Sequence, residues 1–183
     1  IMKYLDSDAL AVYATVINIS TFVQCCAYSV GQAAQPIIAT NFGAGKGGRI
    51  RQVLRLALGT SAFFGVFWTA LSVACPKLYI RIFMAPTPEI LAIAPAIIRI
   101  YAMSFLLLPF IIFSTYYFQA IMKPRAAFVV SVVRGLVISG VLILLLPVLA
   151  GAEALWLAMP ITEVLVMVYA AAVMRSYTAA LKG

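Results

Sequence analysis

The fold is decided by residues 126–149, which read AAFVVSVVRGLVISGVLILLLPVL. This stretch contains one charged side chain, Arg134, and is otherwise almost entirely apolar or small. An α-helix of about 20 residues spans the roughly 30 Å hydrocarbon core of a bilayer, whereas a surface helix of a soluble protein keeps a polar face. The stretch has no such face and predicts a transmembrane helix.

Four more stretches of this kind lie at about residues 9–41, 53–75, 91–121 and 154–174. Hydrophobic residues make up 65% of the 183 residues and charged residues 10%, compared with roughly half and a quarter in soluble domains. A soluble core of this size cannot bury so much apolar surface. We therefore predict an all-α, polytopic membrane helix bundle with about five transmembrane helices.

Basic residues gather in two of the breaks between these stretches. They are Lys46, Arg49, Arg51 and Arg55 in the first break and Lys123 and Arg125 in the third. Because cytoplasmic loops are enriched in Lys and Arg, we expect both breaks in the cytoplasm, with the chain starting outside and its C-terminus inside. The second break is less clear, since Lys77 and Arg81 lie there with Glu89. The net charge of +8 is spread over several loops, so we expect no nucleic-acid partner.

The residues needed for enzymatic or metal chemistry are scarce. The chain has no His and only five acidic residues. Its three cysteines, Cys25, Cys26 and Cys75, have no further ligands at a suitable spacing. We therefore expect no enzyme activity, no catalytic residue, no metal site and no cofactor.

Residues 43–48, GAGKGG, formally match the G-x-G-x-x-G dinucleotide pattern. That pattern needs a preceding strand, whereas here a long apolar helix precedes it. It also lacks the Ser or Thr that follows the Gly-Lys pair in a P-loop. We interpret the segment as a flexible cytoplasmic turn.

Polar residues recur at three- and four-residue steps along the first stretch. They are Asn18, Thr21, Gln24, Cys25, Tyr28, Gln32 and Gln35. At 100° per residue they fall within an arc of about 120°. Unpaired amides are costly in lipid, so this stripe is expected to face other helices or a water-filled cavity. Hydrogen bonding between helices and cavity lining remain as alternatives.

Two ionisable residues lie inside the fourth and fifth stretches. Arg134 is roughly 12 Å and Glu163 roughly 16 Å from the cytoplasmic end, at 1.5 Å per helical residue. An ionised carboxylate at this depth is expensive without a partner. We hypothesise that Arg134 and Glu163 pair across adjacent helices, either as a structural clamp or as a protonation switch.

The third stretch carries Tyr116 and Gln119 beyond Pro109, which frees a backbone carbonyl and is expected to kink the helix. Tyr116 has two interpretations, stacking on a planar cation or anchoring at the membrane interface. Small residues form two further stripes, and both predict close helix packing. One stripe is Ala57, Ser61, Gly65 and Thr69, and the other is Ser131, Gly135 and Ser139.

Several short motifs follow one another in a recognisable order. They are GQAAQP at 31–36, NFGAG at 41–45 before the basic run, QAIMKP at 119–124, Arg134-Gly135, and WLAMP at 156–160 with Glu163. In this order the sequence resembles the multidrug and toxic compound extrusion (MATE) family over essentially the whole chain. No signal peptide is recognisable before the first stretch, and we interpret Ile1 as an internal position of a longer protein.

The resemblance implies an architecture of twelve helices in two six-helix lobes around a central cavity. Members of the family export drug-like, often cationic compounds against sodium or proton entry. Residues 1–183 are then expected to be a partial C-terminal lobe, helices eight to twelve, with the N-terminal lobe as its partner. Some members carry an acid in the fourth helix of this lobe, but no Asp or Glu occurs here between Glu89 and Glu153. The coupling-ion site is therefore not identified.

We predict secondary active efflux of small, cationic or amphipathic organic compounds by proton or sodium antiport, in the plasma (inner) membrane of a bacterium. The alternatives are a lipid-linked precursor flippase of related architecture and a non-transporting membrane scaffold subunit. Candidate cavity residues are Asn18, Gln24, Tyr28, Gln32, Gln35, Tyr116 and Gln119. Arg134 and Glu163 are the candidate charge or protonation network.

Overall fold

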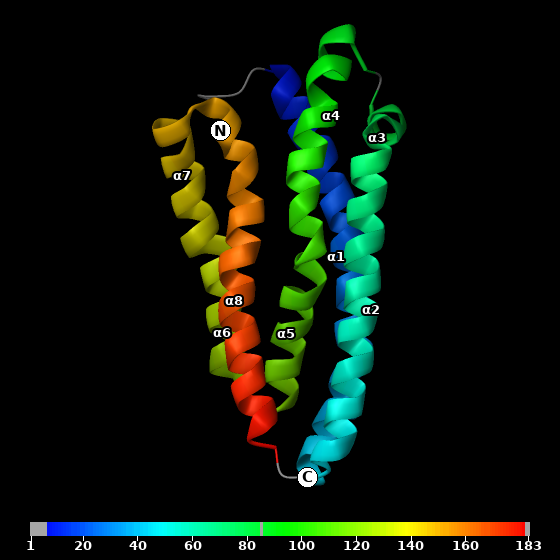
Figure 1. Ribbon diagram of the computed structural model, residues 1–183, viewed down its shortest axis with the longest axis vertical. Coiled ribbons are helices and arrows are strands. Elements are labelled where there is room, and N and C mark those ends of the chain that lie inside the picture. Colours follow the sequence, from blue (N-terminus) through cyan, green and yellow to red (C-terminus); the bar gives the residue numbers. More distant parts are fainter. Residues whose placement is uncertain (1–6, 85, 182–183) are drawn as a thin grey trace.

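A computed structural model describes residues 7–84 and 86–181, which form an antiparallel bundle of helices joined by short turns (Figure 1). The elements, in chain order, are α1 (Ser7–Gly43), α2 (Gly47–Ala74), α3 (Pro76–Phe83), α4 (Pro88–Ala102), η1 (Met103–Leu106), α5 (Leu108–Ala120), α6 (Pro124–Val132), η2 (Val133–Ile138), α7 (Ser139–Ala150), η3 (Ala152–Leu157) and α8 (Ala158–Ala179). Within the described ranges there is no strand.

In the described part of the chain, five continuous helical segments are long and apolar enough to cross a membrane. The first crossing is α1, the second is α2, and the third is α4 with η1 and α5. The fourth is α6 with η2 and α7, and the fifth is η3 with α8. The predicted all-α membrane bundle with five long spans is thus confirmed.

The third crossing occupies the centre of the bundle and the fourth lies at its edge. Helix α5 packs against α1, α2, α6 and α8, and in Figure 1 it lies between α8 and α2. In the third crossing 61% of the most apolar 18 residues are buried, compared with 11% in the fourth. The hydrophobic core is therefore built around α4 and α5, with α1 along their side.

The turn between α1 and α2 is closed by backbone hydrogen bonds. The amide of Lys46 donates to the carbonyl of Asn41 (2.9 Å), and the amide of Gly45 donates to that of Phe42 (3.1 Å). Gly45 has a φ of +67°, the left-handed conformation that commonly ends a helix and that glycine adopts without strain. The GAGKGG segment is thus a helix-ending turn, as we interpreted it from the sequence.

The first small-residue stripe is a packing surface, and the second is only partly one. A Cβ added to Gly65 would lie 2.6 Å from the carbonyl oxygen of Leu106, and Thr69 donates to the carbonyl of Ala102 (3.3 Å). By contrast Gly135 is exposed and a Cβ there would meet no heavy atom within 4 Å, although Ser139 is buried. The expected close contact at Gly135 is therefore wrong for the described residues, because the fourth crossing lies at the edge.

Prolines begin helices here more often than they bend them. Pro76 begins α3, an amphipathic helix in the second break between the predicted transmembrane stretches. Pro109 is the second residue of α5, and the third crossing departs from α-helical geometry just before it, in the 3₁₀ turn η1. A proline is accommodated in the first turn because its missing amide has no partner there.

Helix α2 begins at Gly47 rather than near residue 53, because the basic run is itself helical.

Candidate functional site

An ion pair lies inside the bundle between the fourth and fifth crossings. Arg134 Nε donates to both carboxylate oxygens of Glu163, at 3.0 Å and 3.2 Å, and Arg134 Nη2 donates to Oε1 at 2.7 Å. The Glu163 side chain is 1% exposed and that of Arg134 is 21% exposed. The pair suggested by the matching depths of these residues is therefore present, whereas its role remains a prediction.

Each partner reaches the pair from a different kind of helix. Glu163 lies on the regular helix α8, where Thr162 binds back to the carbonyl of Ala158 (2.7 Å). Arg134 lies in η2, a π-helical segment between α6 and α7. Wide turns of this kind are rare and frequently occur at functional sites.

Burial makes the pair depend on both of its members. Charges taken out of water are costly, and removing one partner leaves the other uncompensated. Among the described residues, Arg134 is the only side chain that hydrogen-bonds to the Glu163 carboxylate. The pair is therefore the main polar tie between the peripheral fourth crossing and the fifth.

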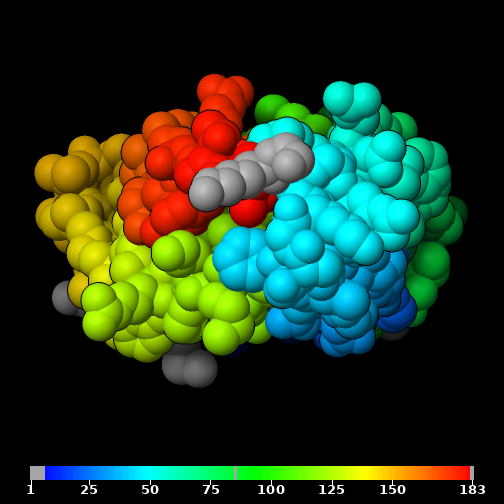
Figure 2. All heavy atoms as spheres, turned by 90° about the horizontal axis from the view of Figure 1, so that it is seen from below, coloured from blue at the N-terminus to red at the C-terminus, as the bar shows by residue number. Residues whose placement is uncertain are grey.

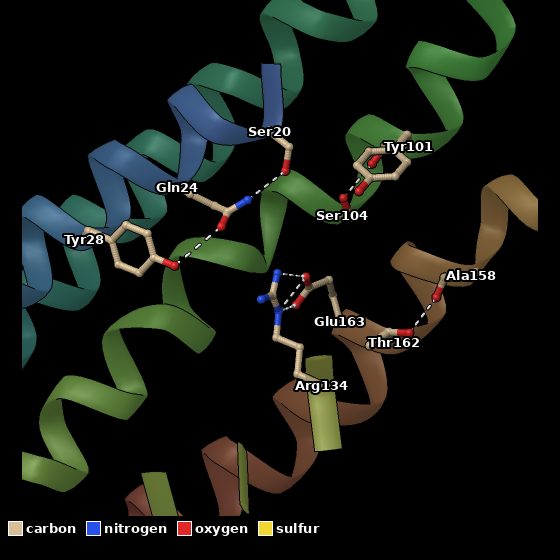
Figure 3. A network of polar contacts seen from close by, with 9 residues as sticks. All are labelled: Ser20, Gln24, Tyr28, Tyr101, Ser104, Arg134, Ala158, Thr162 and Glu163. Atoms are coloured by element: carbon tan, nitrogen blue, oxygen red, sulfur yellow. Dashed lines mark hydrogen bonds and ion pairs between the residues drawn. The ribbon is translucent and has the colours of Figure 1, made fainter. Parts of the chain in front are cut away.

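Polar groups of α1 and of the third crossing lie around this pair (Figure 3). Gln24 donates to the hydroxyl of Ser20 (3.2 Å), and the Tyr28 hydroxyl donates to Gln24 Oε1 (3.5 Å). Figure 3 shows that Tyr28 and Arg134 point into the same space between α1 and α8. On the side of the third crossing, Ser104 binds the carbonyl of the buried Tyr101 (2.7 Å).

The polar stripe of α1 lies beside its buried face and is largely exposed. Gln35 Nε2 donates to Oε1 of Gln119 (3.2 Å), so these two candidates from distant parts of the sequence meet. Tyr28 and Tyr116 form an edge-to-face pair with ring centroids 6.4 Å apart. Some side chains of the stripe therefore form hydrogen bonds with other described residues, whereas others are exposed without such a bond.

Not every candidate joins these contacts. Asn18 and Gln32 are exposed, and within the described ranges neither side chain makes a hydrogen bond to another side chain. Thr21 binds back to the carbonyl of Ile17 (3.0 Å), and Cys25 is exposed and unpaired with any described cysteine. The arc predicted from the sequence therefore forms one side of α1 without forming one network.

Two polar residues near the pair were missed by sequence reasoning. Ser20 lies one turn before Gln24, a spacing that could have extended the stripe, but serine is common on apolar helices. Tyr101 reads as a core aromatic in a run of Ile and Ala, and nothing in the sequence indicates its place near the pair. No group of three or more metal-ligating side chains occurs in the part of the chain that is described.

A model of the MatE family matches residues 1–145. The chain belongs to this family. No curated protein matches its sequence. Three solved structures show how far the likeness of this MatE chain extends.

An outward-facing multidrug resistance MATE family transporter of the MOP superfamily superimposes with a TM-score of 0.87 and 14% identity, covering 95% of this chain and 39% of that one. An inward-facing transporter of the same description superimposes with a TM-score of 0.83 and 14% identity, covering 93% of this chain and 40% of that one. At this identity both show a shared fold. The MATE multidrug transporter DinF-BH, solved in complex with a ligand, superimposes with a TM-score of 0.81 and 27% identity, covering 90% of this chain and 37% of that one. The chain thus spans about two fifths of the length of these transporters.

Proposed function

We propose that this segment is part of the C-terminal lobe, helices eight to twelve, of a transporter that exports small cationic or amphipathic organic compounds by cation antiport. The observation that carries the proposal is the buried Arg134–Glu163 pair beside the polar side of α1. Three facts fit this function: the chain belongs to a family of transporters, its described part has five long apolar helices, and an ion pair lies between two of them. The N-terminal lobe would complete the central cavity.

The position of the polar side chains supports a cavity at this side of the bundle. Tyr28 and Gln24 lie on α1, and Arg134 points into the same space from the fourth crossing. Amides and hydroxyls that are exposed here would be costly against lipid and useful against water or a substrate. Tyr28 and Tyr116 offer aromatic faces to a planar cation.

The Arg134–Glu163 pair supplies a switch that a cation can operate. Protonation of Glu163 removes the negative charge that holds Arg134, so the fourth crossing is freed from the fifth. A proton suits this geometry better than sodium, because both carboxylate oxygens already accept hydrogen bonds from Arg134 and a bound sodium ion needs several oxygen ligands. Alternating access would then use this release to move the lobe against its partner.

The orientation follows from charge. The starts of α2 and α6 and the end of α8, which carry basic side chains, lie at one end of the bundle (Figure 2). The helices that carry Asp8, Glu89 and Glu153 begin at the opposite end, where α3 also brings Lys77 and Arg81 (Figure 1). Positive loops favour the cytoplasmic side, and this supports our proposal that the C-terminus is cytoplasmic. A flippase for lipid-linked pyrophosphates would need an uncompensated cation in the cavity. Arg134 is neutralised by Glu163, so no observation favours that alternative.

The test is ethidium efflux by the full-length protein in energised membrane vesicles, with nigericin in potassium medium to collapse the pH gradient and, separately, sodium-free medium to remove the sodium gradient. Glu163→Gln is expected to reduce gradient-driven efflux at least tenfold, since the carboxylate can no longer exchange a proton. Glu153→Gln, an exposed acid of the same crossing, is the control and should leave efflux within about twofold, as expected of a surface substitution. Unchanged efflux in Glu163→Gln would limit the pair to a structural role. No efflux by the wild-type protein, with any gradient, would favour a scaffold.

A further inference from the structure

A second candidate site lies in a groove between α2 and α8, whose lining on α8 begins at Met167, one helical turn from Glu163. Its volume is about 390 Å³, and α5 forms its floor with Phe110 and Ser114. Helices α2 and α8 each pack on α5, and they have no extensive contact with each other among the described residues. The described residues therefore leave the groove open between α2 and α8, where an acyl chain can enter.

The walls of the groove change from apolar to basic along its length. On α8 the lining positions Met167, Met174 and Thr178 recur at helical spacing and so share one face, which runs for roughly 16 Å at 1.5 Å per residue. On α2 the lining residues are Arg51, Leu54 and Leu58. The deep end is thus apolar, and Arg51 and Arg175 lie at the end that meets the membrane surface.

The charge at this end is positive without compensation from any described acid. Arg51 Nη2 donates to the carbonyl of Leu181 (2.6 Å), which leaves its other N–H groups available. The Lys123 ammonium lies 5.4 Å from the ring centroid of Tyr177, and so adds a third cation near α8. Figure 2 shows the starts of α2 and α6 and the end of α8 together at this end.

We propose that this groove binds an acidic phospholipid from the adjoining leaflet, with an acyl chain along α8 and α5 and the phosphate between Arg51 and Arg175. The long apolar wall fits a hydrocarbon chain and offers little to a polar ligand. Guanidinium groups bind phosphate with paired hydrogen bonds, and basic side chains beside a membrane attract anionic headgroups. The basic end of the groove also disfavours a cationic cargo, so we expect its occupant to be an anionic lipid.

The experiment uses the full-length protein purified in detergent, with lipid retention measured by native mass spectrometry after addition of phosphatidylglycerol or phosphatidylcholine. Wild-type protein is expected to retain phosphatidylglycerol about tenfold better. The double variant Arg51→Gln/Arg175→Gln should lose about tenfold of that retention, in line with the attraction of each basic residue to anionic lipid. The matched control, Arg55→Gln/Arg125→Gln, removes the same charge at the same end outside the groove and should stay within about twofold of wild type.

A second pair of variants tests the apolar wall. Ala171→Phe fills the groove and should abolish retention of phosphatidylglycerol, whereas Ala172→Phe, at a position outside it, should not. Equal losses in the two double arginine variants would indicate diffuse surface charge and overturn the proposal. So would unchanged retention in Ala171→Phe. Displacement of the lipid by equimolar oleate would instead assign the groove to a free fatty acid.

Discussion

The third and fourth crossings are both interrupted helices, yet they are held in the bundle in different ways. In the third crossing, α4, η1 and α5 are surrounded by neighbours, and 61% of the most apolar 18 residues are buried. In the fourth crossing, α6, η2 and α7 lie at the edge, with 11% buried and one ion pair at mid-depth. The comparison leads us to expect that packing holds the central crossing, whereas the peripheral one depends more on the Arg134–Glu163 pair and on the few buried residues of α6.

Breaking the ion pair should have the largest effect on stability. Glu163→Ala leaves the Arg134 guanidinium buried without a partner, and we expect a loss of about 3–5 kcal/mol in the free energy of unfolding. Arg134→Met/Glu163→Leu removes both charges and should recover most of that loss. Unfolding of the full-length protein in mild detergent measures both. A double variant as unstable as Glu163→Ala would show that the charges themselves are required.

The next largest difference is expected when an apolar side chain is truncated in the third crossing and in the fourth and the losses of stability are compared. Phe113 of α5 is completely buried, so Phe113→Ala is expected to cost about 3 kcal/mol through the cavity that it leaves. Leu144 of α7 is 73% exposed, and Leu144→Ala should change stability by less than about 0.5 kcal/mol. The same unfolding assay compares them. Similar losses would mean that the rest of the protein packs against α7.

The glycines offer a smaller and sharper contrast. Gly65→Ala places a methyl group 2.6 Å from the backbone oxygen of Leu106, which cannot move without shifting η1, and should cost about 1–3 kcal/mol. Gly135→Ala adds a methyl group in open space within a helix, and it should be neutral or stabilising by up to about 1 kcal/mol. Thermal unfolding of the two variants checks the sign. Destabilisation by Gly135→Ala would place a neighbouring helix there.

The smallest expected effect concerns the contact between the first and third crossings at Gln35 and Gln119. Their hydrogen bond is exposed, and a double-mutant cycle with Leu at both positions should give a coupling energy near 0.6 kcal/mol, the average for such bonds in membrane bundles. A value of several kcal/mol would make the contact part of the bundle's core.

The sequence was sufficient for the number of crossings, because an apolar run such as residues 126–149 has no place in a soluble domain. It also suggested the pairing of Arg134 with Glu163, since two isolated charges at similar depth have few other partners. The sequence did not show which crossing lies at the centre. Gly135 has the same small-residue spacing as Gly65, but only Gly65 meets a neighbour. Periodicity identifies a face of a helix, whereas the partner of that face depends on the fold.

The candidate site was predictable to a similar extent. Gln24 and Tyr28 were recognisable as polar residues in an apolar helix. The contact of Gln35 with Gln119 was not predictable, because it joins parts of the chain that no local pattern connects. The π-helical geometry around Arg134 was not predicted either, because residues 133–138 carry no pattern that distinguishes a π-helical turn from an α-helical one.

The most direct test of the central claim is gradient-driven ethidium efflux by full-length Arg134→Met/Glu163→Leu, measured beside its thermal stability. This variant removes the charges and keeps apolar packing, so it separates a clamp from a switch. We predict a protein nearly as stable as wild type that has lost gradient-driven efflux. Efflux at the wild-type rate from this double variant would contradict it and would reduce the Arg134–Glu163 pair to a structural clamp.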